Sequence, residues 1–143
     1  MFVVFDLDGT LTDAGHREHF VQRPKGQKDW ESFHANGKDD PPKLAIVTTY
    51  LALTSAGHRI DIWTGRDEAY RAQTELWLGD HGISGATLRM RPTNDHTEDF
   101  KMKAGWYDAE DNKPELVFED RRRVVDMWRA KGVTCCQVAP GDF

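Results

Sequence analysis

Short apolar runs alternate along the chain with longer stretches in which apolar residues recur at helical spacing. Residues 2–5 are all apolar, a pattern typical of a strand buried on both faces. Four further strands are predicted at residues 60–63, 87–90, 116–118 and 133–138. Helical patterns fill the intervals between most of them, which implies right-handed crossovers between parallel strands. The pattern therefore predicts a three-layer α/β domain, with a central parallel sheet covered by helices on both faces.

The helices are predicted at residues 41–57, from 67 or 68 to 82, 97–107 and 121–131. The first of them opens with two prolines, which suit a first helical turn, and ends at a glycine. Its buried face is expected to consist of Leu44, Val47 and Leu51. At 143 residues the chain is long enough for one domain that buries roughly two thirds of its unfolded surface. We therefore expect residues 1–143 to form a single domain.

Composition narrows the class of protein. Charged residues make up 30% of the chain, and no apolar run approaches the ~20 residues of a membrane span. The start of the chain lacks the pattern of a signal peptide, and Cys135 and Cys136 are expected to be buried, reduced thiols. These features predict a cytoplasmic protein that does not contact membranes. The net charge of −5 argues against broad, charge-driven nucleic-acid binding but leaves room for a local basic patch.

The polar stretch at residues 12–40, which we call the flap, is longer than an ordinary connection and is a candidate functional loop or small cap. Its basic residues could attract phosphorylated ligands; they are Arg17, Arg23, Lys25 and Lys28. Trp30 and Phe33 are three residues apart on a possible short helix. They could stack on a nucleobase, or they could anchor the flap to the core. The sequence leaves both interpretations open.

Polar residues that suit phosphate chemistry follow several of the predicted strands. Asp6 and Asp8 come directly after the first strand, and Gly9 suggests that the chain turns there. Thr64 follows the second strand, and Glu119 and Asp120 follow the fourth. In an open α/β sheet the carboxyl ends of the strands are where ligands bind. Carboxylates that share such a site repel one another unless a cation or a shared proton relieves them.

The stretch from Asp6 to Thr10 resembles the first motif of the haloacid dehalogenase (HAD) phosphohydrolases. Thr64, Lys101 and the Glu119-Asp120 pair are similar to the other three HAD motifs, in the same order. The resemblance covers nearly the whole chain. It implies a Rossmann-like HAD fold with a small cap insert after the first strand, and a phosphatase that uses an aspartyl-phosphate intermediate.

Catalytic roles can be assigned to four of these residues. A carboxylate can attack phosphorus, and Asp6, the first and deepest acid, is assigned as the nucleophile. Asp8 could protonate the leaving oxygen and later activate water. Thr64 would bind phosphoryl oxygens, and Lys101 would neutralise charge on Asp6 and on the transferred group. Lys103, on the other side of the predicted helix, is the competitor for the role of Lys101.

Oxygen ligands on the strand ends suit Mg²⁺, which bridges readily to phosphate. Asp6 and Asp120 are the expected side-chain ligands, and the resemblance adds the backbone carbonyl of Asp8. Glu119 could orient these ligands or bind the metal through water. Family members often have Asp at the position of Glu119, which leaves its role the least defined.

The C-terminal run from Phe118 to Phe143 resembles the end of the 3′-phosphatase domain of bacteriophage polynucleotide kinase–phosphatases. This resemblance implies removal of a 3′-phosphate from nucleic acid or a nucleotide, with Gly65 and Arg66 in the substrate site. Arg66 could instead form a structural salt bridge, and Arg91 is a further basic candidate near the site. No Gly-x-x-x-x-Gly-Lys-Ser/Thr motif is present, so no fused kinase domain is expected, and a separate kinase or ligase partner is left open.

Three functions remain in competition. The first is an Mg²⁺-dependent phosphatase for 3′-phosphates of nucleic acid. The second is a phosphatase for mononucleotides, such as a 5′-nucleotidase, or for another small phosphate ester. The third is a catalytically idle domain that binds partners, which the joint presence of the motif residues disfavours.

Overall fold

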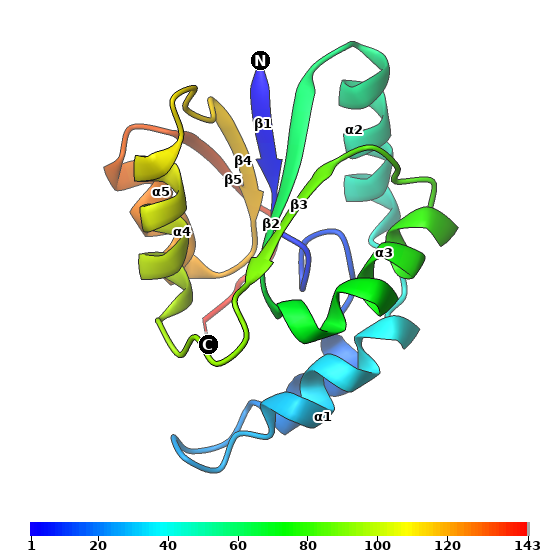
Figure 1. Cartoon of the computed structure of the whole chain (residues 1–143), viewed down its shortest axis with the longest axis vertical. Helices are drawn as coiled ribbons and strands as arrows, with labels where there is room; N and C mark the ends of the chain where they lie inside the picture. Colours follow the sequence, from blue (N-terminus) through cyan, green and yellow to red (C-terminus); the bar gives the residue numbers. More distant parts are fainter. Residues whose placement is uncertain (143) are drawn as a thin grey trace.

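The computed structural model describes residues 1–142 and has a five-stranded, fully parallel sheet at its centre (Figure 1). The strand order is β3-β2-β1-β4-β5. The strands are β1 (Phe2–Phe5), β2 (Arg59–Asp67), β3 (Thr87–Arg91), β4 (Leu116–Glu119) and β5 (Thr134–Gln137). The chain therefore runs outward from β1 in both directions, and β1 lies at the switch point where α/β proteins bind ligands. The predicted α/β class is confirmed.

Helices cover both faces of the sheet, as the sequence predicted. Figure 1 shows α2 (Leu44–Ser55) and α3 (Arg71–Asp80) on one side and α4 (Asp99–Ala109) and α5 (Arg122–Ala130) on the other. Successive side chains of β1 point to opposite faces, so Val3 and Phe5 belong to one core cluster and Phe2 and Val4 to the other. This division explains why the whole of β1 is apolar.

The buried face of α2 differs from the prediction. Val47 and Tyr50 are buried, whereas Leu44 and Leu51 are 71% and 39% exposed. Tyr50 packs edge-on against Phe5, with 5.4 Å between ring centroids. The prediction is confirmed for Val47 and wrong for the two leucines, because it passed over the tyrosine, whose ring is largely apolar.

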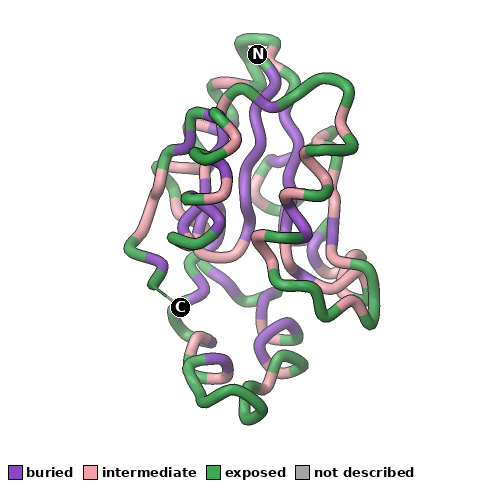
Figure 2. Tube along the Cα trace, turned by 90° about the vertical axis from the view of Figure 1, so that its left-hand side faces the viewer, coloured by how far each residue is buried: buried purple, intermediate pink, exposed green. Residues whose placement is uncertain are grey.

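The flap forms a small body at the carboxyl ends of the strands. It contains two short 3-10 helices, η1 (Gly15–Phe20) and η2 (Asn36–Asp39), and between them α1 (Trp30–Ala35). Ala14, Val21 and Phe33 make a separate apolar cluster inside it. Figure 2 shows that most of its outer loop is exposed, in contrast to the central strands.

Two further expectations from the sequence concern membrane spans and the two cysteines. Within residues 1–142 no helix has the length and apolar character that crossing a membrane requires. Both cysteines are free thiols, but only Cys135 is buried. The prediction for Cys136 was wrong because neighbouring residues of β5 point to opposite sides, and Cys136 lies on the exposed one.

Candidate active site

The two N-terminal acids lie where β1 ends, at the centre of the sheet. The backbone N–H of Asp6 still donates to Phe118 O of β4, at 2.9 Å, so Asp6 is fixed against the neighbouring strand. Gly9 then turns the chain with a φ of +84°, and a Cβ atom there would lie 2.2 Å from Asp120 Oδ2. Glycine is therefore required at this position, both for the turn and for the approach of Asp120.

Asp6, Glu119 and Asp120 form a buried carboxylate cluster, in which one oxygen of each lies within 4.8 Å of the others. Burial, and next the charge of Glu119, raise the pKa of Asp6 to about 8. Burial, and next the charge of Asp6, raise the pKa of Asp120 to about 7. These shifts mean that the cluster holds protons unless positive charge compensates it. Hard carboxylate oxygens in this arrangement fit a divalent cation such as Mg²⁺.

Lys103 already supplies some positive charge, which lowers the pKa values of Asp6 and Asp120 but leaves both raised. Its Nζ lies 2.7 Å from Asp6 Oδ1, 2.8 Å from Glu119 Oε2 and 3.5 Å from Asp99 Oδ2. Although burial opposes the charge, Asp6, Asp99 and Glu119 raise the pKa of Lys103 well above its ordinary value. The ammonium group is therefore permanently charged and held against the oxygens of Asp6.

Lys101 does not reach this cluster, which corrects the sequence prediction. Its side chain is 60% exposed and pairs with Glu98 at 2.7 Å. α4 begins at Asp99, and Lys103, one turn further on, shares its inward face. Lys101 lies two residues from Lys103 and therefore points outward. The competing assignment to Lys103 agrees with the structure.

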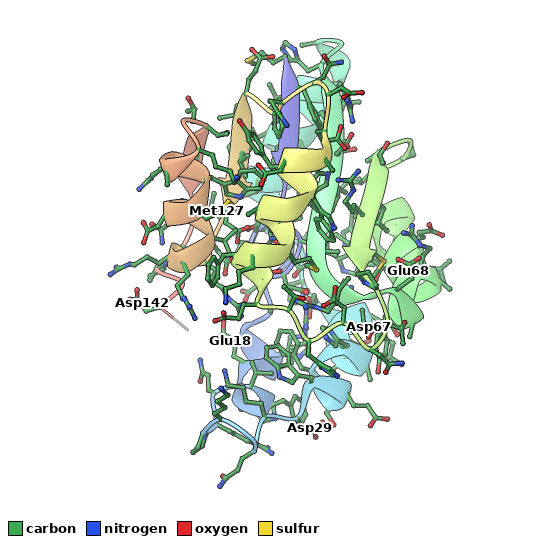
Figure 3. All side chains as sticks on the ribbon, turned by 60° about the vertical axis from the view of Figure 1, so that its left-hand side comes forward. Glu18, Asp29, Asp67, Glu68, Met127 and Asp142 are labelled. Atoms are coloured by element: carbon green, nitrogen blue, oxygen red, sulfur yellow. The ribbon has the colours of Figure 1, made fainter. Side chains whose placement is uncertain are left out.

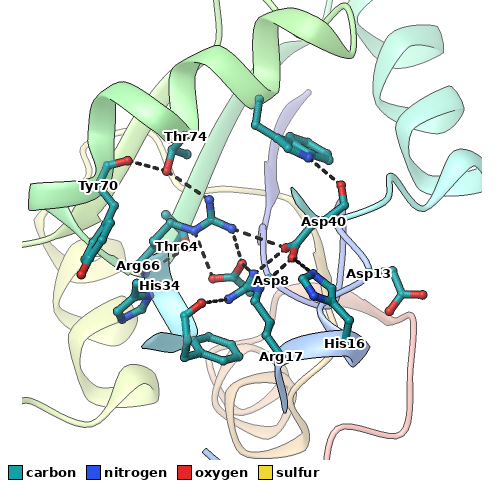
Figure 4. Close-up of polar contacts among 12 residues, drawn as sticks. Asp8, Asp13, His16, Arg17, His34, Asp40, Thr64, Arg66, Tyr70 and Thr74 are labelled. Carbon is teal, nitrogen blue, oxygen red and sulfur yellow. Dashed lines mark hydrogen bonds and ion pairs between the residues drawn. The ribbon is translucent and has the colours of Figure 1, made fainter. Parts of the chain in front are cut away.

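Asp8 belongs to a second group, the arginine cluster, which consists of Asp8, Arg17, Asp40 and Arg66 (Figure 4). Both guanidinium groups donate to the Asp8 carboxylate. Burial alone would raise the pKa of Asp8, but the charges of Arg66 and Arg17 hold it well below its usual range. For Arg66 the structure thus shows the salt bridge that the sequence left as an alternative to substrate contact.

Asp40 fixes the geometry of the arginine cluster. Its carboxylate accepts from Arg17 Nε at 2.7 Å and from His16 Nε2 at 2.8 Å. Its backbone carbonyl accepts from Trp77 Nε1 of α3, at 2.8 Å. Sequence reasoning assigned Arg17 only to a general basic patch and missed Asp40. The signal that could have pointed to Asp40 is its position before Pro41, where the backbone is extended and joins the flap to α2.

The segment Thr64–Gly65–Arg66 lies beside both clusters. Thr64 is fully buried, and its Oγ1 accepts from the backbone N–H of Arg66 at 3.1 Å. A Cβ on Gly65 would lie 2.7 Å from Asp99 Oδ1, so glycine allows α4 to approach. Arg91 donates to the carbonyl of Gly65 at 3.0 Å and to that of Asp95 at 3.1 Å. Arg91, the basic candidate of the sequence analysis, thus holds this segment by its backbone, and a contact of Arg91 with substrate stays a prediction.

The two aromatic residues of the flap play different parts. Phe33 is buried, and the guanidinium carbon of Arg17 lies 4.1 Å from its ring centroid. Trp30 is 42% exposed. Phe33 therefore anchors the flap, while Trp30 is accessible to a ligand.

A cavity of about 380 Å³ opens between the flap and the C-terminal segment, next to Gly9 and Asp120. Most of its charged lining is acidic, with Asp13, Glu18 and Asp142 around Lys43. Figure 3 shows Glu18, on η1, and Asp142 on the same side of the molecule. This acidic lining does not suit a row of phosphates.

The sheet order, the Asp6/Asp8 pair, the buried lysine and the acidic pair after β4 together define a HAD-type phosphatase. A family model described as the polynucleotide kinase PNKP phosphatase domain matches residues 1–143. The chain therefore belongs to the family of PNKP phosphatase domains, within the HAD superfamily.

Solved structures agree with this assignment. A chain of a structure described as the Pnkp1/Rnl/Hen1 RNA repair complex is 30% identical with a TM-score of 0.81, and the match covers 99% of this chain and 43% of that one. The haloacid dehalogenase-like protein SP0104 from Streptococcus pneumoniae is 14% identical with a TM-score of 0.61, covering 95% and 83%. L-2-haloacid dehalogenase from Xanthobacter autotrophicus is 11% identical with a TM-score of 0.61, covering 96% and 76%. The last two share the fold, and the chain spans less than half the length of the first.

Proposed function

We propose that the protein is an Mg²⁺-dependent phosphomonoester hydrolase that removes 3′-phosphates from nucleic-acid ends or nucleotides. The observation that carries this proposal is the position of Asp6, which lies in the carboxylate cluster and 2.7 Å from the Lys103 ammonium. The membership of the PNKP family supports the 3′-phosphate as substrate.

Two members of the carboxylate cluster would provide metal ligands. The side chains of Asp6 and Asp120 and the backbone carbonyl of Asp8 would hold Mg²⁺, and Glu119 would orient them. Glu119 Oε1 accepts from the backbone N–H groups of Asp120 and Arg121, both at 3.2 Å, which suits this orienting role. When bound, the cation offsets the repulsion between the anionic nucleophile and the anionic phosphate.

The reaction has two steps. In the first, an oxygen of Asp6 attacks phosphorus, the bond from phosphorus to the ester oxygen breaks, and the leaving alkoxide takes a proton from Asp8. In the second, Asp8 accepts a proton from water as that water attacks the aspartyl-phosphate, which releases phosphate and regenerates Asp6. Lys103 neutralises Asp6 throughout, and Thr64 with the neighbouring amides binds the phosphoryl oxygens.

Asp8 must carry a proton to act as an acid, whereas Arg17 and Arg66 keep it ionised in the ligand-free structure. A substrate phosphate that binds Arg66 replaces Asp8 as the partner of that guanidinium. The exchange removes one of the two ion pairs that hold the pKa of Asp8 down and brings an anion next to it, and both changes raise that pKa toward the value an acid needs in the first step.

A mononucleotide or another small phosphate ester is the second candidate substrate. The acidic lining of the cavity beside Asp120 favours it, because a groove for a long strand needs basic contacts to several phosphates. The neighbour from the RNA repair complex raises the further proposal that the protein works with a separate kinase or ligase.

A phosphate-release assay tests the proposed function. The substrates are a 3′-phosphorylated oligonucleotide, nucleoside 3′- and 5′-monophosphates and p-nitrophenyl phosphate, each with Mg²⁺ and with EDTA. We expect release from the 3′-phosphates with Mg²⁺ alone, and none from the Asp6→Asn protein prepared in parallel. Preference for 5′-monophosphates would favour the second candidate, and full activity in EDTA would remove the metal from the mechanism.

A further inference from the structure

Three aromatic rings lie in a row beside the arginine cluster, and we call them the aromatic ridge: Trp30 and His34 of α1, and Tyr70 of η3 (Glu68–Tyr70). The ring centroids of Trp30 and His34 are 6.1 Å apart at 27° between planes, and those of His34 and Tyr70 are 5.4 Å apart at 38°. Figure 4 shows His34 next to Tyr70 and close to Arg66. The ridge thus joins the flap to the segment that follows β2.

Trp30 differs from the tryptophans of the core. Trp63, Trp77 and Trp128 are at most 4% exposed, whereas Trp30 is 42% exposed. Lys28 Nζ lies 5.6 Å from its ring centroid, so the solvent side of the ridge carries a cation. An exposed indole beside a cation is a surface on which a base can stack and a phosphate can be paired.

His34 carries a polar atom that indicates a ligand. The residue is only 9% exposed, and its Nδ1 is buried without a hydrogen-bond partner among residues 1–142. Burial, assisted by the charges of Arg66 and Arg17, outweighs the opposing effect of Asp8 and lowers the pKa of His34 to about 4. The ring is therefore neutral near pH 7. A buried polar atom without a partner is costly, and water or a ligand that reaches Nδ1 would remove that cost.

The ridge is held at a fixed position relative to Asp8. The carbonyl of Phe33, next to His34, accepts from Arg17 Nη1 at 2.9 Å. The carbonyl of His34 accepts from Gln73 Nε2 of α3, also at 2.9 Å. A Cβ on Gly37, just after α1, would lie 3.0 Å from Arg66 Nη2. The two arginines that bind Asp8 thus also position the helix that carries Trp30 and His34.

From this arrangement we infer that the aromatic ridge is the binding site for the nucleobase of the nucleotide that carries the scissile phosphate. The inference rests on the proposed function, because it places the phosphate of that nucleotide at Arg66 and Asp6. Stacking on Trp30 supplies the affinity, and His34 Nδ1 supplies a polar contact. Since every base has a π-face, the ridge accepts all four bases and favours the larger purines.

Calorimetric titration of a protein that cannot turn over gives the direct test. The Asp6→Asn protein is titrated, with Mg²⁺ present, with adenosine 3′-monophosphate and separately with inorganic phosphate. Adding Trp30→Ala should weaken binding of the nucleotide by about 5- to 150-fold, the range expected for one lost base stack, and leave phosphate binding unchanged. Trp30→Phe should retain most of the affinity. Leu76→Ala, at an apolar side chain that is 70% exposed on α3, is the matched control and should change neither ligand.

The outcomes separate the ridge from the proposed function. Equal losses for nucleotide and phosphate, or no loss for either, would overturn the inference about the ridge. In either case the Trp30→Ala enzyme, with Asp6 restored, would still release phosphate from adenosine 3′-monophosphate, so the proposed function would stand. Failure of the wild-type protein to release phosphate from any ester would refute the proposed function instead. If the Trp30→Ala protein unfolds, the site with Trp30 intact is tested instead. It should bind purine nucleotides more tightly than pyrimidine nucleotides, and the absence of this preference would contradict the inference about the ridge.

Discussion

The site contains two charged clusters, linked along the chain by the step from Asp6 to Asp8, that differ in their balance of charge. The carboxylate cluster sets Asp6, Glu119 and Asp120 against one cation, Lys103. The arginine cluster sets two carboxylates, Asp8 and Asp40, against two guanidinium groups. The first is therefore incomplete without a further cation. The arginine cluster has balanced charges without a ligand. It can bind an anion only when Asp8 is displaced from its guanidinium partner.

The clusters also differ in what positions them. The acids of the first follow β1 and β4, and its lysine comes from α4, so the rigid sheet layer builds it. The second needs Arg17 and Asp40, which the flap supplies from either side of α1. We therefore expect changes in the first cluster to act on chemistry and metal binding, and changes in the second to act also on the stability of the flap.

The largest effect should come from the lysine that partly neutralises the carboxylate cluster. Lys103→Met removes the charge that lies against Asp6, and kcat should fall by about 100- to 1,000-fold, the cost of losing one group that stabilises charge in a transition state. Steady-state kinetics with a 3′-phosphorylated nucleotide measure it. Lys101→Met is the matched control, because Lys101 is on the same helix and exposed, and its kcat should stay within about twofold. The opposite ranking would restore the prediction made from the sequence.

In the arginine cluster, Asp40→Asn should lower the free energy of unfolding by about 3 kcal/mol, because it removes one of the two carboxylates that pair with the buried Arg17. Urea denaturation measures the loss. Asp39→Asn changes the neighbouring exposed acid and should have an effect within about 0.5 kcal/mol. Equal stability of the two variants would mean that Asp8 alone suffices to hold Arg17 and Arg66.

A smaller and more gradual effect should appear as a pH dependence of metal binding. Burial raises the pKa of Asp6 to about 8 and that of Asp120 to about 7, above their ordinary value of 3.8. A carboxyl group whose pKa is raised by folding stabilises the folded protein at pH values below its pKa in the unfolded chain. This stabilisation is lost as the pH rises through its pKa in the folded protein. The metal-free protein should therefore lose stability between about pH 4 and pH 8, and Mg²⁺, which displaces those protons, should stabilise it more at pH 8 than at pH 5.

Melting temperatures in EDTA and in Mg²⁺ across this range check the expectation. The Asp120→Asn protein provides the control, since it has lost one of the three carboxyl groups of the cluster and should show a flatter pH profile. An Mg²⁺ shift that stays constant or shrinks toward pH 8 would contradict the charge imbalance assigned to the carboxylate cluster.

The two clusters also differ in how far the sequence could predict them. Asp6 and Asp120 follow strands whose apolar runs are plain, and parallel strands bring their carboxyl ends together, so the carboxylate cluster could be predicted from the pattern. The choice between Lys101 and Lys103 depended on the first residue of α4, and element boundaries are the least certain part of a pattern. Asp40 lies 32 positions from Asp8, in a flap without periodicity, so only the fold brings the two together.

The central claim is that Asp6 becomes phosphorylated during turnover, and chemical trapping tests it most directly. The protein is mixed with excess 3′-phosphorylated nucleotide and Mg²⁺, quenched in acid within the first turnover, and reduced with borohydride, which converts an aspartyl-phosphate to homoserine. Peptide mass spectrometry should then find homoserine at position 6, and not in the Asp6→Asn protein or without Mg²⁺. Rapid phosphate release with position 6 still aspartate, or with the modification at another carboxylate, would contradict the account.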